Sequence, residues 1–242
     1  MRVKYLGNSG FAIGIQQSLL LIDDISQGSF IRPEALRAFD RVTVLVSHVH
    51  SDHYDAGIFG RGAPLNDHIQ YVISGDVMDQ QPLPAHVSAL RIDPGQAVQV
   101  NGMDIHAFES TDAGVSFDIY HPLEPQRNIR IFHAGDLNDW HWREENNPDW
   151  TAMQAHEFSR IVASIPTEPR MDLAFFPFDP RMGPGYEEGA LQFIHHFRPV
   201  MTVPMHFGAM WTEPAGLAAQ IEGETLLCPL STPGTALDAE LT

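Results

Sequence analysis

The chain has 242 residues, a formal net charge of −17, a hydrophobic content of 43% and one cysteine, Cys228. This composition excludes a largely disordered protein, and a single cysteine excludes an intrachain disulfide. The negative charge would repel nucleic-acid backbones and anionic lipids, and no segment approaches the length of an apolar membrane span. We therefore expect one cytoplasmic domain over residues 1–242 that binds neither nucleic acid nor membrane.

The first half of the chain is rich in predicted strands. Apolar segments bounded by Gly or Asn turns predict strands at 2–7, 10–15, 18–24, 41–47 and 69–74, with a helix at 32–39. The segment AVQVNGMDIHAFES contains an Asn-Gly turn, which predicts a hairpin over 97–110. Strands are expected next at 115–121 and 128–136.

Strands and helices alternate in the second half. Apolar residues at helical spacing predict helices at 149–165, 185–197 and 213–223. The intervening apolar runs predict strands at 171–178, 200–206 and 224–230. Consecutive strands followed by strand and helix alternation are typical of a layered α/β domain.

The segment SHVHSDHYD gathers metal-binding side chains at the end of a predicted strand. Side chains two positions apart on a strand point the same way, so His48 and His50 should converge, while Asp52 and His53 follow in a turn. Neutral imidazole and carboxylate groups are ligands that divalent metal ions such as zinc prefer. A solvated loop is the alternative interpretation, but two histidines in phase beside an Asp-His pair favour a metal site.

This His-x-His-x-Asp-His motif resembles the signature of the metallo-β-lactamase-fold hydrolases. Two later segments fit the same resemblance, since IRIFHAGD ends at Asp136 and VMTVPMH ends at His206, each at the end of a predicted strand. The resemblance implies a four-layer αββα sandwich in which Asp136 bridges two metal ions and His206 supplies the last ligand. It also implies that Asp52 binds the second ion and orients a hydroxide.

One ligand of the family pattern is absent. The family has a further histidine before the bridging Asp, but the segment HAFESTDAGVSF offers Glu109 and Asp112 as replacement ligands, because His106 falls inside a predicted strand. We also interpret His133 as a core residue. The site is therefore expected to bind one or two divalent ions, zinc first, with manganese or iron as alternatives.

Two loops after predicted strands offer candidates for substrate contact. In GDLNDWHW, Trp140 and Trp142 are expected at the mouth of the site, where Trp140 could stack on a substrate and His141 could act as an extra ligand or catalytic proton donor. Alternatively, the two tryptophans anchor the loop to the core and His141 is solvated. In FFPFDPRMG, Asp179 and Arg181 are candidate substrate-binding residues, and Arg181 could clamp a carboxylate or phosphate. An ion pair between Asp179 and Arg181 that rigidifies this loop is the alternative.

The expected function is hydrolysis of a small-molecule ester, lactone or phosphodiester by a metal-bound hydroxide. The segments GNSGFAI, TDAGVSF and PMHFG resemble most the branch that includes L-ascorbate-6-phosphate lactonase. A non-catalytic metal-binding or ligand-sensing module on the same fold is the first alternative, which the absent histidine motivates. A nuclease is the second, which the net charge of −17 disfavours. The oligomeric state does not follow from the sequence.

Overall fold

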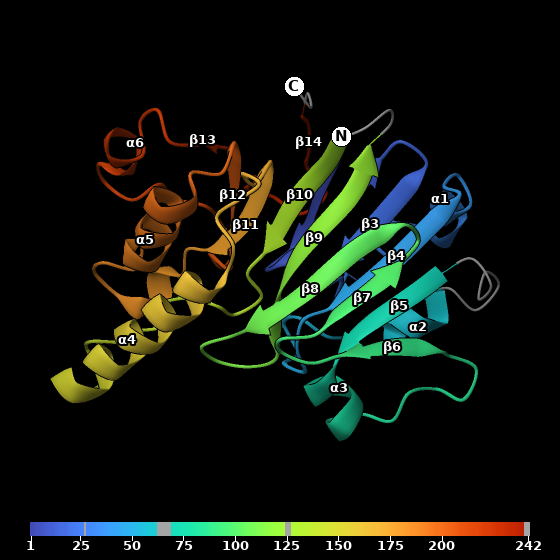
Figure 1. Cartoon of the computed structure of the whole chain (residues 1–242), viewed down its shortest axis with the longest axis horizontal. Coiled ribbons are helices and arrows are strands. Elements are labelled where there is room, and N and C mark those ends of the chain that lie inside the picture. Colours follow the sequence, from blue (N-terminus) through green and yellow to red (C-terminus); the bar gives the residue numbers. More distant parts are fainter. Residues whose placement is uncertain (27, 62–68, 124–126, 240–242) are drawn as a thin grey trace.

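The computed structural model describes residues 1–242 except 27, 62–68, 124–126 and 240–242, and within these residues two seven-stranded sheets face each other (Figure 1). The first sheet has the order β14-β1-β2-β3-β4-β5-β6. Its strands are β1 (Arg2–Gly7), β2 (Gly10–Ile15), β3 (Ser18–Ile22), β4 (Arg41–Val46), β5 (Ile69–Ser74), β6 (Ala89–Ile92) and β14 (Ala236–Asp238).

The second sheet has the order β13-β12-β11-β10-β9-β8-β7. Its strands are β7 (Ala97–Val100), β8 (Met103–Glu109), β9 (Val115–Leu123), β10 (Arg127–His133), β11 (Leu173–Pro177), β12 (Met201–Met205) and β13 (Leu226–Leu227). Both sheets are mixed. Strands β3 to β6 and β10 to β13 pair in parallel, and the remaining neighbours pair antiparallel.

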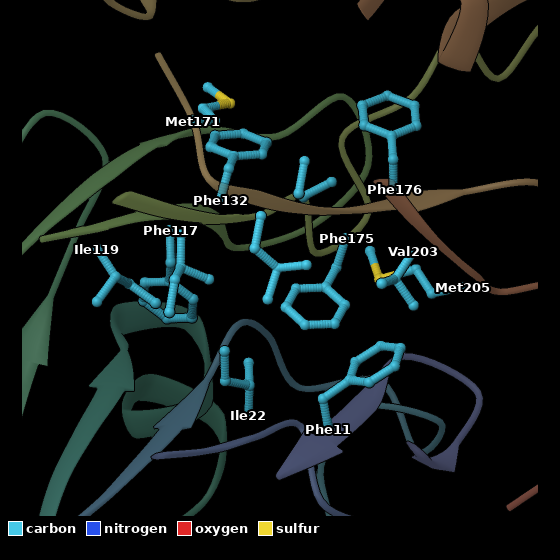
Figure 2. Close-up of a cluster of buried hydrophobic side chains, with 14 of the residues drawn as sticks. Phe11, Ile22, Phe117, Ile119, Phe132, Met171, Phe175, Phe176, Val203 and Met205 are labelled. Carbon is cyan, nitrogen blue, oxygen red and sulfur yellow. The ribbon is translucent and has the colours of Figure 1, made fainter. Parts of the chain in front are cut away.

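The space between the sheets is filled by aromatic and branched side chains (Figure 2). Phe11 of β2 and Phe175 of β11 have ring centroids 4.2 Å apart, which joins the two sheets directly. Ile22 of β3 and Phe117 of β9 are buried in the same cluster. These positions come from segments that the sequence predicts as strands, and their burial is the main source of stability for a core of this kind.

Helices cover the outer faces of both sheets. They are α1 (Pro33–Leu36), α2 (Gly57–Arg61), α3 (Gly75–Gln80), α4 (Pro148–Ser164), α5 (Glu188–Phe197) and α6 (Leu217–Gln220), with a short 3₁₀ turn η2 (Pro180–Met182). Outside the second sheet, Phe193 of α5 packs against Phe176 and Phe132. Outside the first sheet, Phe59 of α2 contacts Tyr71 of β5. The predicted four-layer sandwich is confirmed.

Some predicted elements are shorter than expected. The helix predicted at 32–39 is regular only over Pro33–Leu36, because the following amides of Arg37, Ala38 and Phe39 bond three residues back. The helix predicted at 213–223 spans Leu217–Gln220, since Gly216 before it adopts a left-handed backbone. Helices α2 and α3 and strands β6 and β14 are not predicted, because each is short and lacks a clear period.

The described helices include none with the length and apolar character needed to cross a lipid bilayer.

Candidate metal centre

The ends of strands from both sheets meet at one edge of the sandwich. His48 follows β4 in the first sheet, whereas Asp136 and His206 follow β10 and β12 in the second. Two glycines allow this close approach. A Cβ on Gly114 would lie 2.0 Å from the Ser47 carbonyl oxygen, and one on Gly135 would lie 2.6 Å from the Val115 carbonyl oxygen. Both glycines have a positive φ, which glycine adopts without strain.

Two groups of potential ligands lie at this edge. The first contains His48, His50 and Asp136, and the second contains Asp52, His53 and His206, with the ligand atoms of each group within 4.8 Å of one another. All six residues are those predicted from the sequence, and the structure brings them together. The turn after β4 brings the four residues of the first segment together, and the approach of the two sheets adds Asp136 and His206.

Asp136 lies between the two groups. Its Oδ2 is 3.1 Å from His48 Nε2 and 3.8 Å from His50 Nδ1. Its Oδ1 is 3.0 Å from His53 Nε2 and 3.6 Å from His206 Nε2. One carboxylate oxygen thus faces each group, which is the position that a bridging ligand needs.

Buried carboxylates fix the orientation of the histidine rings. Asp23, at the end of β3, accepts from His53 Nδ1 at 2.8 Å and from Ser47 Oγ at 2.6 Å. Ser47 Oγ in turn lies 3.0 Å from His48 Nδ1. Asp179 accepts from His206 Nδ1 at 3.0 Å. Each Nδ1 is thereby engaged, so the three Nε2 atoms face the site, as in carboxylate–histidine–metal arrangements.

The charges of the centre are strongly coupled. Burial disfavours the charged form of His53, but the Asp136 and Asp23 carboxylates overcome it and raise its pKa to about 10. Burial likewise opposes charge on His206, whose bonds to Asp179 and Asp52 raise its pKa to about 9. The hydrogen bond from His206 holds the pKa of Asp52 well below its usual range.

Three buried atoms of the centre have no hydrogen-bond partner among the described residues: His48 Nε2, His53 Nε2 and Asp136 Oδ1. They approach one another closely without aligning as hydrogen bonds. Buried polar atoms are normally paired, and two imidazole nitrogens beside a carboxylate oxygen form the donor set of a divalent ion. The residues present therefore fit a metal site.

The two candidate replacements for the absent histidine lie in different places. The Glu109 carboxylate forms an ion pair with Arg160 of α4. Asp112 Oδ2 lies 4.0 Å from His50 Nδ1. The Asp112 side chain lines the same pocket as His50, Asp136 and His206. Of the two, Asp112 is the one placed to complete the first group.

A pocket of about 290 Å³ opens beside the centre. It is lined by His50, Asp52, Thr111, Asp112, Asp136, Trp140, Trp142, Trp150, Gln154, Arg181 and His206. Of the residues predicted for substrate contact, Trp140 and Arg181 line it. Asp179 is fully buried and bonds both His206 and Arg181, so its position assigns it to orienting these two residues. The Asp179–Arg181 pair interpreted from the sequence is present.

His141 lies apart from the pocket lining. Its side chain is fully buried, and its Nδ1 accepts from the Arg143 amide at 3.4 Å. This position does not favour the predicted role of His141 as an extra ligand or proton donor. His133, interpreted as a core residue, is buried, and its Nε2 bonds the Ser9 carbonyl oxygen at 2.8 Å.

Sequence reasoning missed several residues that support the site. Asp23 and Ser47 orient His53 and His48, and Asn8 bonds the Asp52 carboxylate at 3.2 Å. The signal for Asp23 was present, because SLLLIDD ends an apolar strand with two acidic residues beside the strand that carries the histidines. Only the parallel pairing of β3 with β4 turns that pattern into a contact.

No model of a known protein family matches the chain. Over 91% of its length it is 25% identical to a UPF0173 metal-dependent hydrolase from Symbiobacterium thermophilum, of which it covers 92%. The solved structure of Igni18, a metallo hydrolase from Ignicoccus hospitalis, has a TM-score of 0.66 at 16% identity, covering 100% of this chain and 99% of that one. YhfI from Bacillus subtilis, described as a metallo-β-lactamase fold protein, has a TM-score of 0.59 at 12% identity, with 98% of each chain covered. These likenesses confirm the fold class predicted from the sequence.

Proposed function

We propose that this chain, whose fold is that of the metallo-β-lactamases, is a metal-dependent hydrolase of a small-molecule ester or lactone. The observation that carries the proposal is the set of three buried, unpartnered atoms, His48 Nε2, His53 Nε2 and Asp136 Oδ1, at the base of an open pocket. The similarity of the chain to a protein described as a metal-dependent hydrolase supports the same activity.

The donor set suits two ions of the zinc type, although manganese and iron share these ligands. His48, His50 and Asp136 would hold the first ion, with Asp112 as its fourth ligand in place of the absent histidine. His53, His206, Asp52 and Asp136 would hold the second. Ions bound there would supply Lewis acidity and lower the pKa of a water molecule toward neutrality.

The residues around the ligands prepare the site for hydrolysis. Asp23 and Asp179 hold the rings of His53 and His206 in one orientation, which keeps the donor atoms in place before substrate arrives. Asp52 is half-exposed at the pocket, and its Oδ2 lies 3.4 Å from His206 Nε2, so its carboxylate is placed to orient the attacking water.

Arg181 is placed to orient the substrate. Its Nε and Nη2 bond the Asp179 carboxylate, and the side chain is 64% exposed at the pocket. Two or more bonds to Asp179 fix the plane of the guanidinium, so the remaining Nη1 can bind a carbonyl or carboxylate oxygen of the substrate.

A non-catalytic metal-binding module on the same fold is the second candidate, favoured by one observation. Among the residues that the structure describes, no histidine completes the first group, and Asp112 is more than half exposed. Such a site would bind its ions without activating water. Phosphodiester hydrolysis remains within the same chemistry, but the net charge of −17 disfavours nucleic-acid substrates.

Metal content and hydrolysis measured together separate these functions. We expect one or two zinc ions per chain by elemental analysis of the purified protein, and turnover of some members of a panel of esters and lactones. Metal at this stoichiometry without turnover, with zinc or manganese loaded, would favour the non-catalytic module. Unchanged metal content in His50→Ala would reject the site itself, while His196→Ala on the exposed face of α5 serves as the control.

A further inference from the structure

Tryptophan is concentrated at one place in this molecule. The chain has four tryptophans, of which Trp140, Trp142 and Trp150 line the pocket beside the metal-ligand residues. The fourth, Trp211, packs against Phe178 with ring centroids 5.3 Å apart and does not line that pocket. We call Trp140, Trp142 and Trp150 the indole wall.

The inner part of the indole wall is attached to the metal centre. Trp140 is only 7% exposed, and its Nε1 donates to the Asp136 carbonyl oxygen at 2.7 Å. Its ring meets His206 edge-on, with centroids 5.4 Å apart. Trp142 stacks beyond it, at a centroid distance of 6.4 Å and an interplanar angle of 15°. The wall is therefore rigid where it reaches the metal ligands.

Trp142 has an unusual backbone conformation. Its φ is 38°, in the left-handed region that bulky residues rarely adopt and that glycine adopts freely. The conformation is held because the Trp142 carbonyl oxygen accepts from the amides of Glu145 and Asn146, at 3.0 and 3.1 Å. A strained residue that presents a half-buried indole to a pocket points to a role in that pocket.

Trp150 supplies the outer part of the indole wall from a different element. It lies in the first turn of α4, where its amide donates to the N-capping Asn147 side chain at 2.9 Å. Gln154, one turn later on the same helix face, also lines the pocket. Two partly exposed indoles, one from a turn and one from a capped helix, thus face a single space.

We propose that the substrate of this site carries a flat aromatic ring, which packs against Trp142 and Trp150 while the ester or lactone group lies at the metal ligands. This inference rests on the proposed function. Aromatic pairs gain energy beyond the area that they bury when they stack or meet edge to face. The pocket of about 290 Å³ has room for a ring and a reacting carboxyl group, since an apolar cavity of about 150 Å³ holds benzene.

A quaternary ammonium group is the other ligand that indoles bind well. Two features of this pocket disfavour it. Two divalent ions would more than offset the Asp52, Asp112 and Asp136 carboxylates that line the pocket, and Arg181 adds a further positive charge, so a cationic ligand would meet like charge in the metal-loaded protein. An uncharged aromatic ring does not meet this repulsion.

The test uses matched pairs of ligands with zinc-loaded full-length protein. Methyl esters of benzoic, phenylacetic and 3-phenylpropionic acids are compared with their cyclohexyl counterparts as substrates. The free acids phenylacetate and cyclohexylacetate are compared by calorimetry and by quenching of tryptophan fluorescence, which reports binding without turnover. We expect at least one aromatic ester to exceed its saturated counterpart in kcat/KM, and phenylacetate to bind several-fold more tightly than cyclohexylacetate.

Substitutions then assign this preference to the indole wall. Trp142→Ala and Trp150→Ala should each lower the aromatic-to-cyclohexyl ratio by about twofold to tenfold, the range that one aromatic pair provides. Trp142→Phe should retain most of the preference. Trp211→Phe is the control, and it should leave the preference unchanged because Trp211 lies outside the pocket lining.

Equal binding of phenylacetate and cyclohexylacetate, binding of neither, or tighter binding of acetylcholine would overturn the proposed aromatic substrate. None of these results bears on metal-dependent hydrolysis, which fails instead if the protein holds no metal or if no ester or lactone is turned over. Circular dichroism of each variant checks that the fold is retained, and Trp142→Phe keeps the test informative if Trp142→Ala does not fold.

Discussion

Two buried clusters of charge in this protein differ in one respect. On the second sheet, Arg130 is 1% exposed and bonds Asp118 through Nε and Nη2, both at 2.8 Å. Its remaining donors reach the carbonyl oxygens of Pro166 and Pro169, and Tyr120 donates to Asp118. At the metal centre, equally buried groups leave three atoms without partners.

This difference distinguishes the Arg130 cluster, which has a structural role, from the metal centre. The Arg130 cluster is complete, because a charged pair is satisfied by other protein groups and joins β9 and β10 to the 166–169 segment. At the metal centre, three buried atoms converge without hydrogen bonds, and a bound cation would give each of them a partner. Burial and charge alone do not mark a functional site, whereas unsatisfied acceptors that converge do.

The largest expected effect concerns the complete cluster. Arg130→Met leaves the buried Asp118 carboxylate without its partner, which should lower the free energy of unfolding by about 3–5 kcal/mol. Denaturant unfolding measures this loss. The double variant Arg130→Met/Asp118→Leu should recover most of it, and metal content should not change in any variant that folds. A loss of metal from folded Arg130→Met would remove the distinction between the clusters.

The corresponding substitution at the metal centre should affect metal affinity more than stability. Asp136→Ala removes the carboxylate that faces both groups, so zinc affinity should fall by more than the roughly 100-fold that loss of a supporting residue costs. The free energy of unfolding of the metal-free protein should fall by less than in Arg130→Met, because Asp23 still bonds His53 Nδ1 and partners its charge when Asp136 is removed. Calorimetric zinc titration and metal-free melting temperature measure the two effects. A strongly destabilised metal-free variant would contradict this prediction.

The supporting carboxylates give a smaller effect. Asp23→Asn and Asp179→Asn should each weaken zinc binding by about 10- to 100-fold, because His53 and His206 lose the acceptors that orient their rings. Competition with a chromogenic chelator measures the affinity. If both variants bind zinc as the parent does, ring orientation is set by packing rather than by these hydrogen bonds.

Substitution of the two candidate replacement ligands, Asp112 and Glu109, should have different effects on metal binding. Asp112→Ala should lower the affinity for the first ion by at least about tenfold, because Asp112 lies beside His50 and would supply the fourth ligand. Glu109→Ala should leave metal binding unaltered, because Glu109 bonds Arg160 instead. Metal stoichiometry at limiting zinc distinguishes them. Equal responses of the two variants would show that neither carboxylate completes the first group.

The smallest effect is a dependence of stability on pH. The pKa values of His53 and His206 rise from 6.5 to about 10 and about 9 in the metal-free fold. Their protonated forms therefore stabilise the metal-free fold below about pH 6.5, and this stabilisation is lost as the pH rises through 9 to 10. The melting temperature of the metal-free protein should therefore fall over this pH range. Zinc-loaded protein, in which metal replaces these protons, should not show the fall.

Much of the metal centre could be predicted from short segments of sequence. His48, His50, Asp52 and His53 lie within six positions after an apolar run, so local geometry alone brings them close. Asp136 and His206 were identified because each ends a strand in an order that resembles a known fold. The left-handed backbone of Trp142 could not be predicted in this way, since nothing in GDLNDWHW indicates it.

The sequence by itself determined the ligand types, the strands that carry them and the layered class, because strand period and ligand chemistry are local properties. Which distant groups meet depends on the tertiary structure. The pairing of β3 with β4 places Asp23 behind His53, and the approach of the two sheets at Gly114 and Gly135 brings Asp136 to His48. These contacts join residues far apart in the chain, and they depend on how the sheets pack, which no local pattern records.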